Sequence, residues 1–226
     1  MKKWICLGFL VLLLGCKREV ADTWMTPVRA EYYFNRVEQI CNRDNVKLWG
    51  KNLSGPLMLV DRKSRKIFSN MPDNEGLLKL KDKIYTGFFP KEKIINNTAI
   101  TFGGVLFGMV PIPEKEDEYR IISRSIHSLF HRYQETIGIP PAYFIAANMD
   151  EKEARLWMKF EWKALRKAIS IQGEEQLQAL RDALIFRGSN RETYPQYATE
   201  ENKFETYEGL ATFTYMLLAT DRRAHV

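Results

Sequence analysis

The sequence contains the run Ile126-His127-Ser128-Leu129-Phe130-His131-Arg132-Tyr133-Gln134, which lies within a helical pattern from about Glu116 to Ile137. Two of the chain's three histidines, His127 and His131, stand four residues apart in this run. On a helix, this spacing places both imidazoles on one face, about 5.4 Å apart along the axis. The pair could therefore bind one divalent cation, or it could simply pack and form hydrogen bonds inside the protein.

A third metal ligand is expected from the last helical segment, residues 199–220. Catalytic zinc sites have three protein ligands and one open position. The segment contains Glu205 and Glu208, which are expected to share a helix face, and Glu208 is followed by Gly209-Leu210-Ala211. A carboxylate among small and apolar residues is unfavourable on a packed helix unless it is paired or binds a metal. Glu208 is therefore the expected third ligand, although a salt bridge to Arg132 or another base would also satisfy it.

Taken together, these motifs resemble those of the gluzincin metallopeptidases, in which His-x-x-x-His is followed by a glutamate on a later helix. The resemblance implies Zn²⁺ as the metal, His127, His131 and Glu208 as its ligands, and hydrolysis of a peptide-like bond in a peptide or protein substrate. The chain also resembles a group of uncharacterised exported bacterial proteins. The segments that carry this second resemblance are Gly55–Asp61, Phe160–Arg166 and Tyr207–Ala211.

One position departs from the gluzincin pattern. The zinc-hydrolase motif is His-Glu-x-x-His, with the glutamate as general base, and here Ser128 replaces it. A serine has no carboxylate to accept the proton, although it could still hydrogen-bond a water, and general-base catalysis contributes typically about 10²–10⁴-fold. Glu161, Glu205 and Glu135 are the acids that could substitute for the missing base. The sequence therefore predicts a domain that binds metal but hydrolyses poorly or not at all.

Three further side chains near these motifs have two interpretations each. Glu161, in Phe-Glu-Trp, could orient a histidine of the site or pair with a helix cap. Tyr133 and Tyr207 flank the motifs and could donate to a substrate oxyanion, or they could belong to the core.

The N-terminus is typical of an export signal, expected over residues 1–15. Lys2 and Lys3 precede an apolar run from Trp4 to Leu14, which is too short to span a bilayer stably. The run ends in Leu-Leu-Gly and Cys16, which resembles the lipobox of bacterial lipoproteins, whose cysteine is lipidated. The resemblance implies a lipid anchor at Cys16, a tether over residues 16–25 and a location in the cell envelope, on the inner or outer membrane. The alternative is a plain signal peptide or an uncleaved anchor.

Composition restricts the other classes of function. Once Cys16 is acylated and Cys6 is removed, only Cys41 remains, so no intrachain disulfide and no cysteine-rich metal site is expected. Cys41 lies in an apolar-periodic segment and is expected to be buried. The formal charge of +6 falls to +4 without Lys2 and Lys3, the basic residues are scattered, and no nucleic-acid partner is expected.

Residues 26–226 are expected to form a single metallopeptidase-like domain of the α+β class, with an N-terminal helix, a small antiparallel sheet and a mainly helical, zincin-like second half. The first helix is expected from Thr26-Pro27 to Gly50, and the last is expected to end near Thr220, close to an abrupt C-terminus. The expected strands and further helices are 56–61, 66–70, 83–89, 98–110, 150–171 (with Leu156, Phe160, Leu165 and Ile169 inward) and 174–187.

Two functional hypotheses follow from this sequence. The first is a membrane-anchored lipoprotein with a gluzincin-like zinc site, impaired as a peptidase by Ser128. The second is a non-catalytic binding or structural lipoprotein on a peptidase-derived scaffold, in which a metal would only cross-link two helices.

Overall fold

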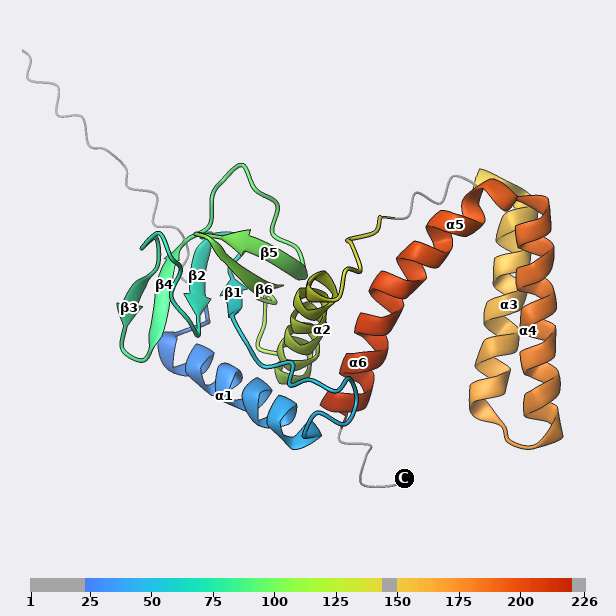
Figure 1. Cartoon of the computed structure of the whole chain (residues 1–226), viewed down its shortest axis with the longest axis horizontal. Coiled ribbons are helices and arrows are strands. Elements are labelled where there is room, and N and C mark those ends of the chain that lie inside the picture. Colours follow the sequence, from blue (N-terminus) through green and yellow to red (C-terminus); the bar gives the residue numbers. More distant parts are fainter. Residues whose placement is uncertain (1–22, 144–149, 221–226) are drawn as a thin grey trace, which may run out of the picture.

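The computed structural model of the chain describes residues 23–143 and 150–220, so the expected signal peptide and Cys16 lie outside the described residues. A helix comes first, six strands follow, and helices form the second half (Figure 1), which confirms the α+β class. In chain order the elements are α1 (Pro27–Asp44), β1 (Leu57–Val60), β2 (Lys66–Ser69), β3 (Lys79–Lys81), β4 (Ile84–Phe88), β5 (Thr98–Phe102), β6 (Val105–Pro111), α2 (Glu118–Thr136), α3 (Lys152–Ser170), α4 (Glu174–Thr193), α5 (Pro195–Phe204), the π-helical turn η2 (Glu205–Gly209) and α6 (Leu210–Ala219).

The six strands form one sheet in the order β3-β4-β2-β1-β6-β5. Four of the pairings are antiparallel, as expected, but β1 and β6 pair in parallel, with Leu57 opposite Gly108, so the sheet is mixed. The expected segment 98–110 is divided into β5 and β6 by Gly103 and Gly104, whose φ angles are +53° and +74°. A two-residue hairpin turn with positive φ at both positions favours glycine, which explains the pair of glycines there.

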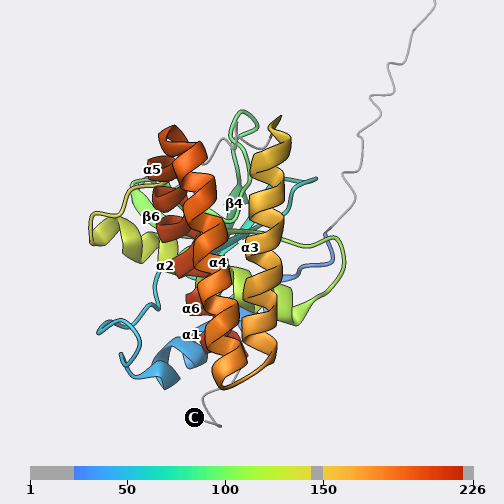
Figure 2. The same ribbon diagram turned by 90° about the vertical axis from the view of Figure 1, so that its right-hand side faces the viewer.

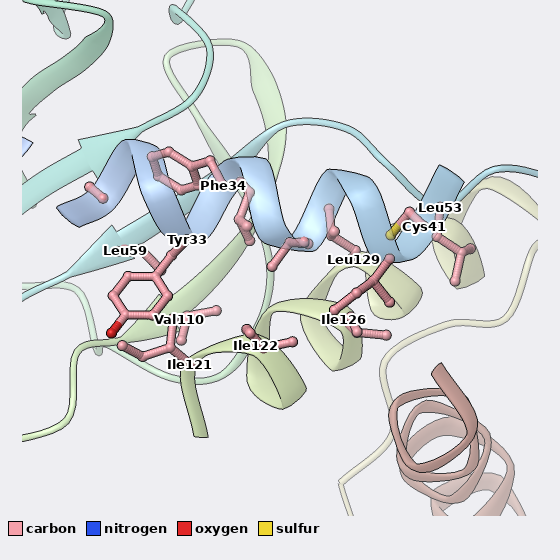
Figure 3. Packing of buried hydrophobic residues seen from close by; sticks show 14 of the residues in the cluster. Tyr33, Phe34, Cys41, Leu53, Leu59, Val110, Ile121, Ile122, Ile126 and Leu129 are labelled. Atoms are coloured by element: carbon pink, nitrogen blue, oxygen red, sulfur yellow. The ribbon is translucent and has the colours of Figure 1, made fainter. Parts of the chain in front are cut away.

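The main core lies between the sheet and the helices α1, α2 and α6. Alternate residues of β1 face opposite sides of the sheet: Leu57 and Leu59 pack toward the helices, while Met58 and Val60 join a second cluster on the other face. Figure 3 shows the side chains of α1 and α2 that meet in the main core. Cys41 is buried there as expected, and burial raises the pKa of its thiol to about 12.

Several helix boundaries differ from the expected ones. The helix α1 ends at Asp44 rather than Gly50, because Asn45 and Val46 adopt left-handed φ angles of +47° and +57°. The helix α4 continues through the expected loop 188–194 as far as Thr193. The last helix begins earlier than expected, at Pro195, and a π-helical turn interrupts it.

The helices α3 and α4 form a hairpin beside the α5–η2–α6 helix, on the side away from the sheet (Figures 1 and 2). The expectation that the apolar residues of α3 point inward is wrong at Ile169, which is 86% exposed, and at Leu156 and Phe160, which are 40% and 39% exposed. Ile169 lies largely in solvent and the other two are partly exposed, because α3 packs mainly against α4 and not against the main body.

Candidate metal centre

The helix α2 carries both histidines of the expected pair. It begins at a cap in which the Asp117 side chain accepts a hydrogen bond from the Arg120 N–H at 2.9 Å. One turn apart on this helix, His127 keeps 12% of its side chain exposed, and the side chain of His131 is fully buried. Their Nε2 atoms are 2.8 Å apart, with the two rings nearly perpendicular. Both imidazoles therefore direct a nitrogen at the same point.

The third member of the cluster comes from the π-helical turn η2. Glu208 places one carboxylate oxygen 3.3 Å from Nε2 of His127 and the other 3.7 Å from Nε2 of His131. The ligand atoms of the three residues all lie within 4.8 Å of one another. The three residues singled out from two distant motifs are therefore brought together, and we call them the His-His-Glu cluster.

The protonation states of His131 and Glu208 suit a metal site. Burial and the neighbouring His127 lower the pKa of His131 to about 4, so this ring is neutral near pH 7. Burial acts to raise the pKa of Glu208, but the hydrogen bond with His127 and the electrostatic attraction of the adjacent imidazoles outweigh it and keep the pKa below its ordinary value. Metal ligation requires a neutral imidazole and an ionised carboxylate.

Gln134 connects the two elements that carry the ligands. Its side-chain oxygen lies 2.8 Å from Nδ1 of His131, and its amide nitrogen donates to the carbonyl oxygens of Thr206 and Tyr207 at 3.3 and 3.0 Å. Since an amide oxygen can only accept, Nδ1 of His131 carries the proton and Nε2 keeps its lone pair. The sequence analysis missed Gln134, although its position three residues after His131, on the same helix face, is a signal for such a partner.

Tyr207 packs on the cluster and holds η2 in place. Its ring stacks on that of His131, with centroids 4.1 Å apart and an angle of 19° between the planes. Its hydroxyl lies 3.5 Å from the Thr98 hydroxyl on β5, and burial raises its pKa. Tyr133 lies elsewhere, where its hydroxyl donates to the Trp49 carbonyl at 3.4 Å.

Ser128 faces the sheet. Its side chain is fully buried, and its hydroxyl donates to the Met109 carbonyl at 2.9 Å. Gly108 lies next to Met109 on the strand β6. A Cβ added to Gly108 would lie only 3.1–3.3 Å from atoms of Ser128 and Leu129. The strand β6 and the helix α2 thus approach closely at a glycine, and the hydroxyl next to His127 is engaged by the strand.

Two of the acids expected as substitutes for the base are bound to Arg187. The guanidinium of Arg187 donates to Glu161 at 2.7 and 2.9 Å and to Glu205 at 2.8 Å. Burial acts to lower the pKa of Arg187, but these two carboxylates raise it above its ordinary value. The expectation that Glu205 and Glu208 share a face is wrong, because side chains three residues apart do not stack in a π-turn as they do in an α-helix. The remaining acid, Glu135, is exposed.

The spacing of the cluster fits a tetrahedral ion. Zinc bonds of about 2.0–2.1 Å to nitrogen and oxygen imply ligand-to-ligand edges of about 3.3–3.4 Å in a tetrahedron. In this cluster the two Nε2 atoms are 2.8 Å apart, and the carboxylate oxygens of Glu208 lie 3.3 and 3.7 Å from them. Small rotations of the side chains would therefore bring one atom of each residue to coordination distance. Two neutral nitrogens and a carboxylate are a donor set that divalent zinc accepts, and three ligands leave the fourth position open.

Comparison with known proteins adds no family to these observations. No family model, no curated protein and no solved structure matches this chain.

Proposed function

We propose that this protein is an exported lipoprotein whose folded domain binds zinc through the His-His-Glu cluster and hydrolyses peptide bonds weakly or not at all. The convergence of three ligand atoms within 4.8 Å carries the metal site. Support for the class of domain comes from the resemblance of the two motifs to those of gluzincins. The choice of zinc rests on the donor set and on the near-tetrahedral spacing.

The residues around the cluster have distinct parts in this proposal. His127, His131 and Glu208 bind the ion, while Gln134 fixes the tautomer of His131. A zinc ion held there would act as a Lewis acid, which lowers the pKa of a bound water and polarises the carbonyl group of a substrate. Glu208 retains 36% exposure of its side chain, so the cluster is open to solvent on the carboxylate side.

The proposed weakness of hydrolysis rests on the absence of a suitable base. Ser128 offers no carboxylate, and its hydroxyl donates to the strand β6. Glu161 and Glu205 are held by Arg187. Because both carboxylates are directed to Arg187 on α4 and not to the histidines, we expect neither acid to replace the general base.

Zinc binding is tested on the purified chain by calorimetry and elemental analysis. We expect one zinc ion per chain, and we expect His131→Ala and Glu208→Gln each to weaken binding strongly. The matched control is Glu174→Gln, which changes a largely exposed carboxylate of α4 outside the cluster. A zinc content far below one ion per chain in saturating zinc would overturn the site.

Peptide cleavage separates the impaired peptidase from the second candidate, a non-catalytic protein in which zinc only links α2 to η2. The engaged states of Ser128, Glu161 and Glu205 favour this second candidate over a fully active enzyme. Zinc-dependent cleavage that is slow and lost in His127→Ala supports the impaired peptidase. Zinc binding without any cleavage supports the structural role, and rapid cleavage by the wild-type chain contradicts both.

The proposed lipid anchor rests on the sequence around Cys16. No helix in residues 23–143 and 150–220 is long and apolar enough to cross a membrane. In an expression host with lipoprotein processing, we expect the wild-type chain in the membrane fraction and Cys16→Ser largely outside it. An unchanged distribution of Cys16→Ser would contradict lipidation as the anchor.

A further inference from the structure

A cavity apart from the His-His-Glu cluster is lined by several cations. It has a volume of about 400 Å³ and lies between the β1–β2 turn, the segment before α2 and the first turns of α2. Arg62 and Lys63 come from the β1–β2 turn, and Arg120 and Arg124 lie one turn apart on α2. Trp24 forms part of the wall and is fixed by a hydrogen bond from its indole N–H to the Pro113 carbonyl at 2.7 Å. We call this cavity the arginine pocket.

The three arginines of the pocket have no ion pair with a carboxylate within the described parts of the chain. Only Lys63 has such a partner, Glu114 at 3.8 Å, and both of these side chains are largely exposed. Arg124 is partly buried. A guanidinium withdrawn from water without a counter-ion destabilises the protein, and a bound anion would offset this.

Two acids also line the pocket, Asp61 and Glu114, against its four cations, and Glu114 pairs with Lys63. One oxygen of Asp61 accepts from the Ser64 N–H at 2.6 Å, from the Ser64 hydroxyl and from the Lys63 N–H, which builds the turn. Asp117 caps α2 through the Arg120 N–H. The cations therefore remain in excess at the pocket. Consistent with this, burial and the neighbouring Arg120 and Arg62 lower the pKa of Arg124, and Asp117 offsets this only in part.

We propose that the arginine pocket binds a phosphate group carried by a lipid headgroup or by a soluble phosphate compound. Guanidinium groups bind phosphate oxygens in pairs of parallel hydrogen bonds, and three guanidiniums from two elements suit a tetrahedral anion. The wall of Trp24 and Ile112 gives the organic part of the ligand an apolar contact. This assignment does not depend on the metal site or on peptidase activity.

The first test measures binding of inorganic phosphate by calorimetry and by thermal unfolding, at constant ionic strength. We expect saturable binding by the wild-type chain and affinity about tenfold weaker in Arg124→Gln, since hydrogen bonds between charged groups are lost. Arg62→Gln changes an exposed residue and repeats the test if Arg124→Gln folds poorly. Arg166→Gln, on an exposed position of α3, is the matched control and should bind phosphate as the wild type does.

The second test compares vesicles of phosphatidylglycerol with vesicles of phosphatidylcholine in a sedimentation assay. Stronger binding to phosphatidylglycerol that free phosphate competes away, and that Arg124→Gln loses, identifies a lipid phosphate. Phosphate binding in solution with equal vesicle binding by the wild type and Arg124→Gln identifies a soluble phosphate compound. The proposal is overturned if the wild-type chain shows no saturable phosphate binding, or if Arg62→Gln and Arg124→Gln both bind phosphate as tightly as it does.

Discussion

Gln134 accepts a hydrogen bond from Nδ1 of His131 at 2.8 Å, and the same side chain donates to the carbonyl oxygens of η2. One amide therefore sets the tautomer of a proposed ligand and holds the helical turn that carries another. Groups of this kind, which contact a ligand rather than the metal, change metal affinity when they are removed.

The role of Gln134 predicts a loss of zinc affinity without a loss of the ligands themselves. We expect Gln134→Ala to weaken zinc binding about 10–100-fold, the range usual for partners of metal-bound histidines. Competition with a chelator of known affinity measures the change. The control is Gln178→Ala, which removes an amide that donates a hydrogen bond to Asp182 on the exposed surface of α4. Equal zinc affinity in the two variants would show that Gln134 does not position His131.

The contact between α2 and β6 predicts that Ser128 contributes to stability rather than to metal binding. We expect Ser128→Ala to lower the free energy of unfolding by about 1 kcal/mol, through loss of the hydrogen bond to Met109, and to leave zinc affinity unchanged. Gly108→Ala should be more destabilising, since its Cβ would lie 3.1–3.3 Å from backbone and side-chain atoms of α2. Urea unfolding of the zinc-loaded and zinc-free protein measures both. A large fall in zinc affinity in Ser128→Ala would mean that its hydroxyl acts at the cluster.

The pairing of Arg187 with Glu161 and Glu205 predicts that the α3–α4 hairpin depends on one guanidinium. Glu161 is 6% exposed, so Arg187→Gln leaves a buried carboxylate with weaker partners. We expect a local loss of about 2–3 kcal/mol, which hydrogen exchange should detect as faster exchange in α3 and α4. The control is Arg181→Gln, whose partner Glu174 is largely exposed. Exchange that rises equally in the sheet would contradict a local effect.

The loop before β3 predicts a fall in stability in acid. Burial acts to raise the pKa of Asp73, but the N–H groups of Leu77, Leu78 and Glu75 donate to it at 2.7–3.0 Å and lower the pKa below the ordinary 3.8. Because the pKa of Asp73 is lower in the folded state than in the unfolded state, its ionised form stabilises the fold. This stabilisation is complete at pH values above the unfolded-state pKa of 3.8, and it is lost as the pH falls through the folded-state pKa.

Asp73→Asn isolates this contribution. We expect it to lower the free energy of unfolding by about 1–2 kcal/mol at neutral pH, and the difference from the wild type should shrink in acid. Denaturant unfolding between neutral pH and the acid range measures this, and Asp82→Asn, on an exposed turn, is the control. A difference that stays constant with pH would show that the charge of Asp73 is not responsible.

Much of the fold and the members of the His-His-Glu cluster could be predicted from the sequence because the relevant signals are local. Thr26 and Pro27 begin α1 as expected. The four-residue spacing of His127 and His131 places both on one face because α2 is a regular helix. Glu208 was identifiable because a carboxylate among small and apolar residues needs a partner.

The remaining features depend on contacts between distant segments. The parallel pairing of β1 with β6 joins strands that are separated by the rest of the sheet in sequence, and no periodicity specifies it. The apolar residues of α3 have a helical spacing that indicates a buried face, but spacing does not show that the hairpin packs away from the main body. The pairing of Glu161 and Glu205 with Arg187 could not be predicted either, because it depends on where α4 lies.

The π-helical turn has a consequence for how changes in chain length would affect the protein. Removing one residue from Glu205–Gly209 would restore a regular α-helix and leave α5 and α6 in nearly the same relative orientation, because a five-residue π-turn rotates the chain about as far as four residues of α-helix. Inside the turn, however, the angle between the side chains of Glu205 and Glu208 would change, and the two could no longer serve Arg187 and the histidines at once. This five-residue turn therefore sets the geometry of the His-His-Glu cluster without redirecting the flanking helices, so a deletion there is far less tolerable than a substitution.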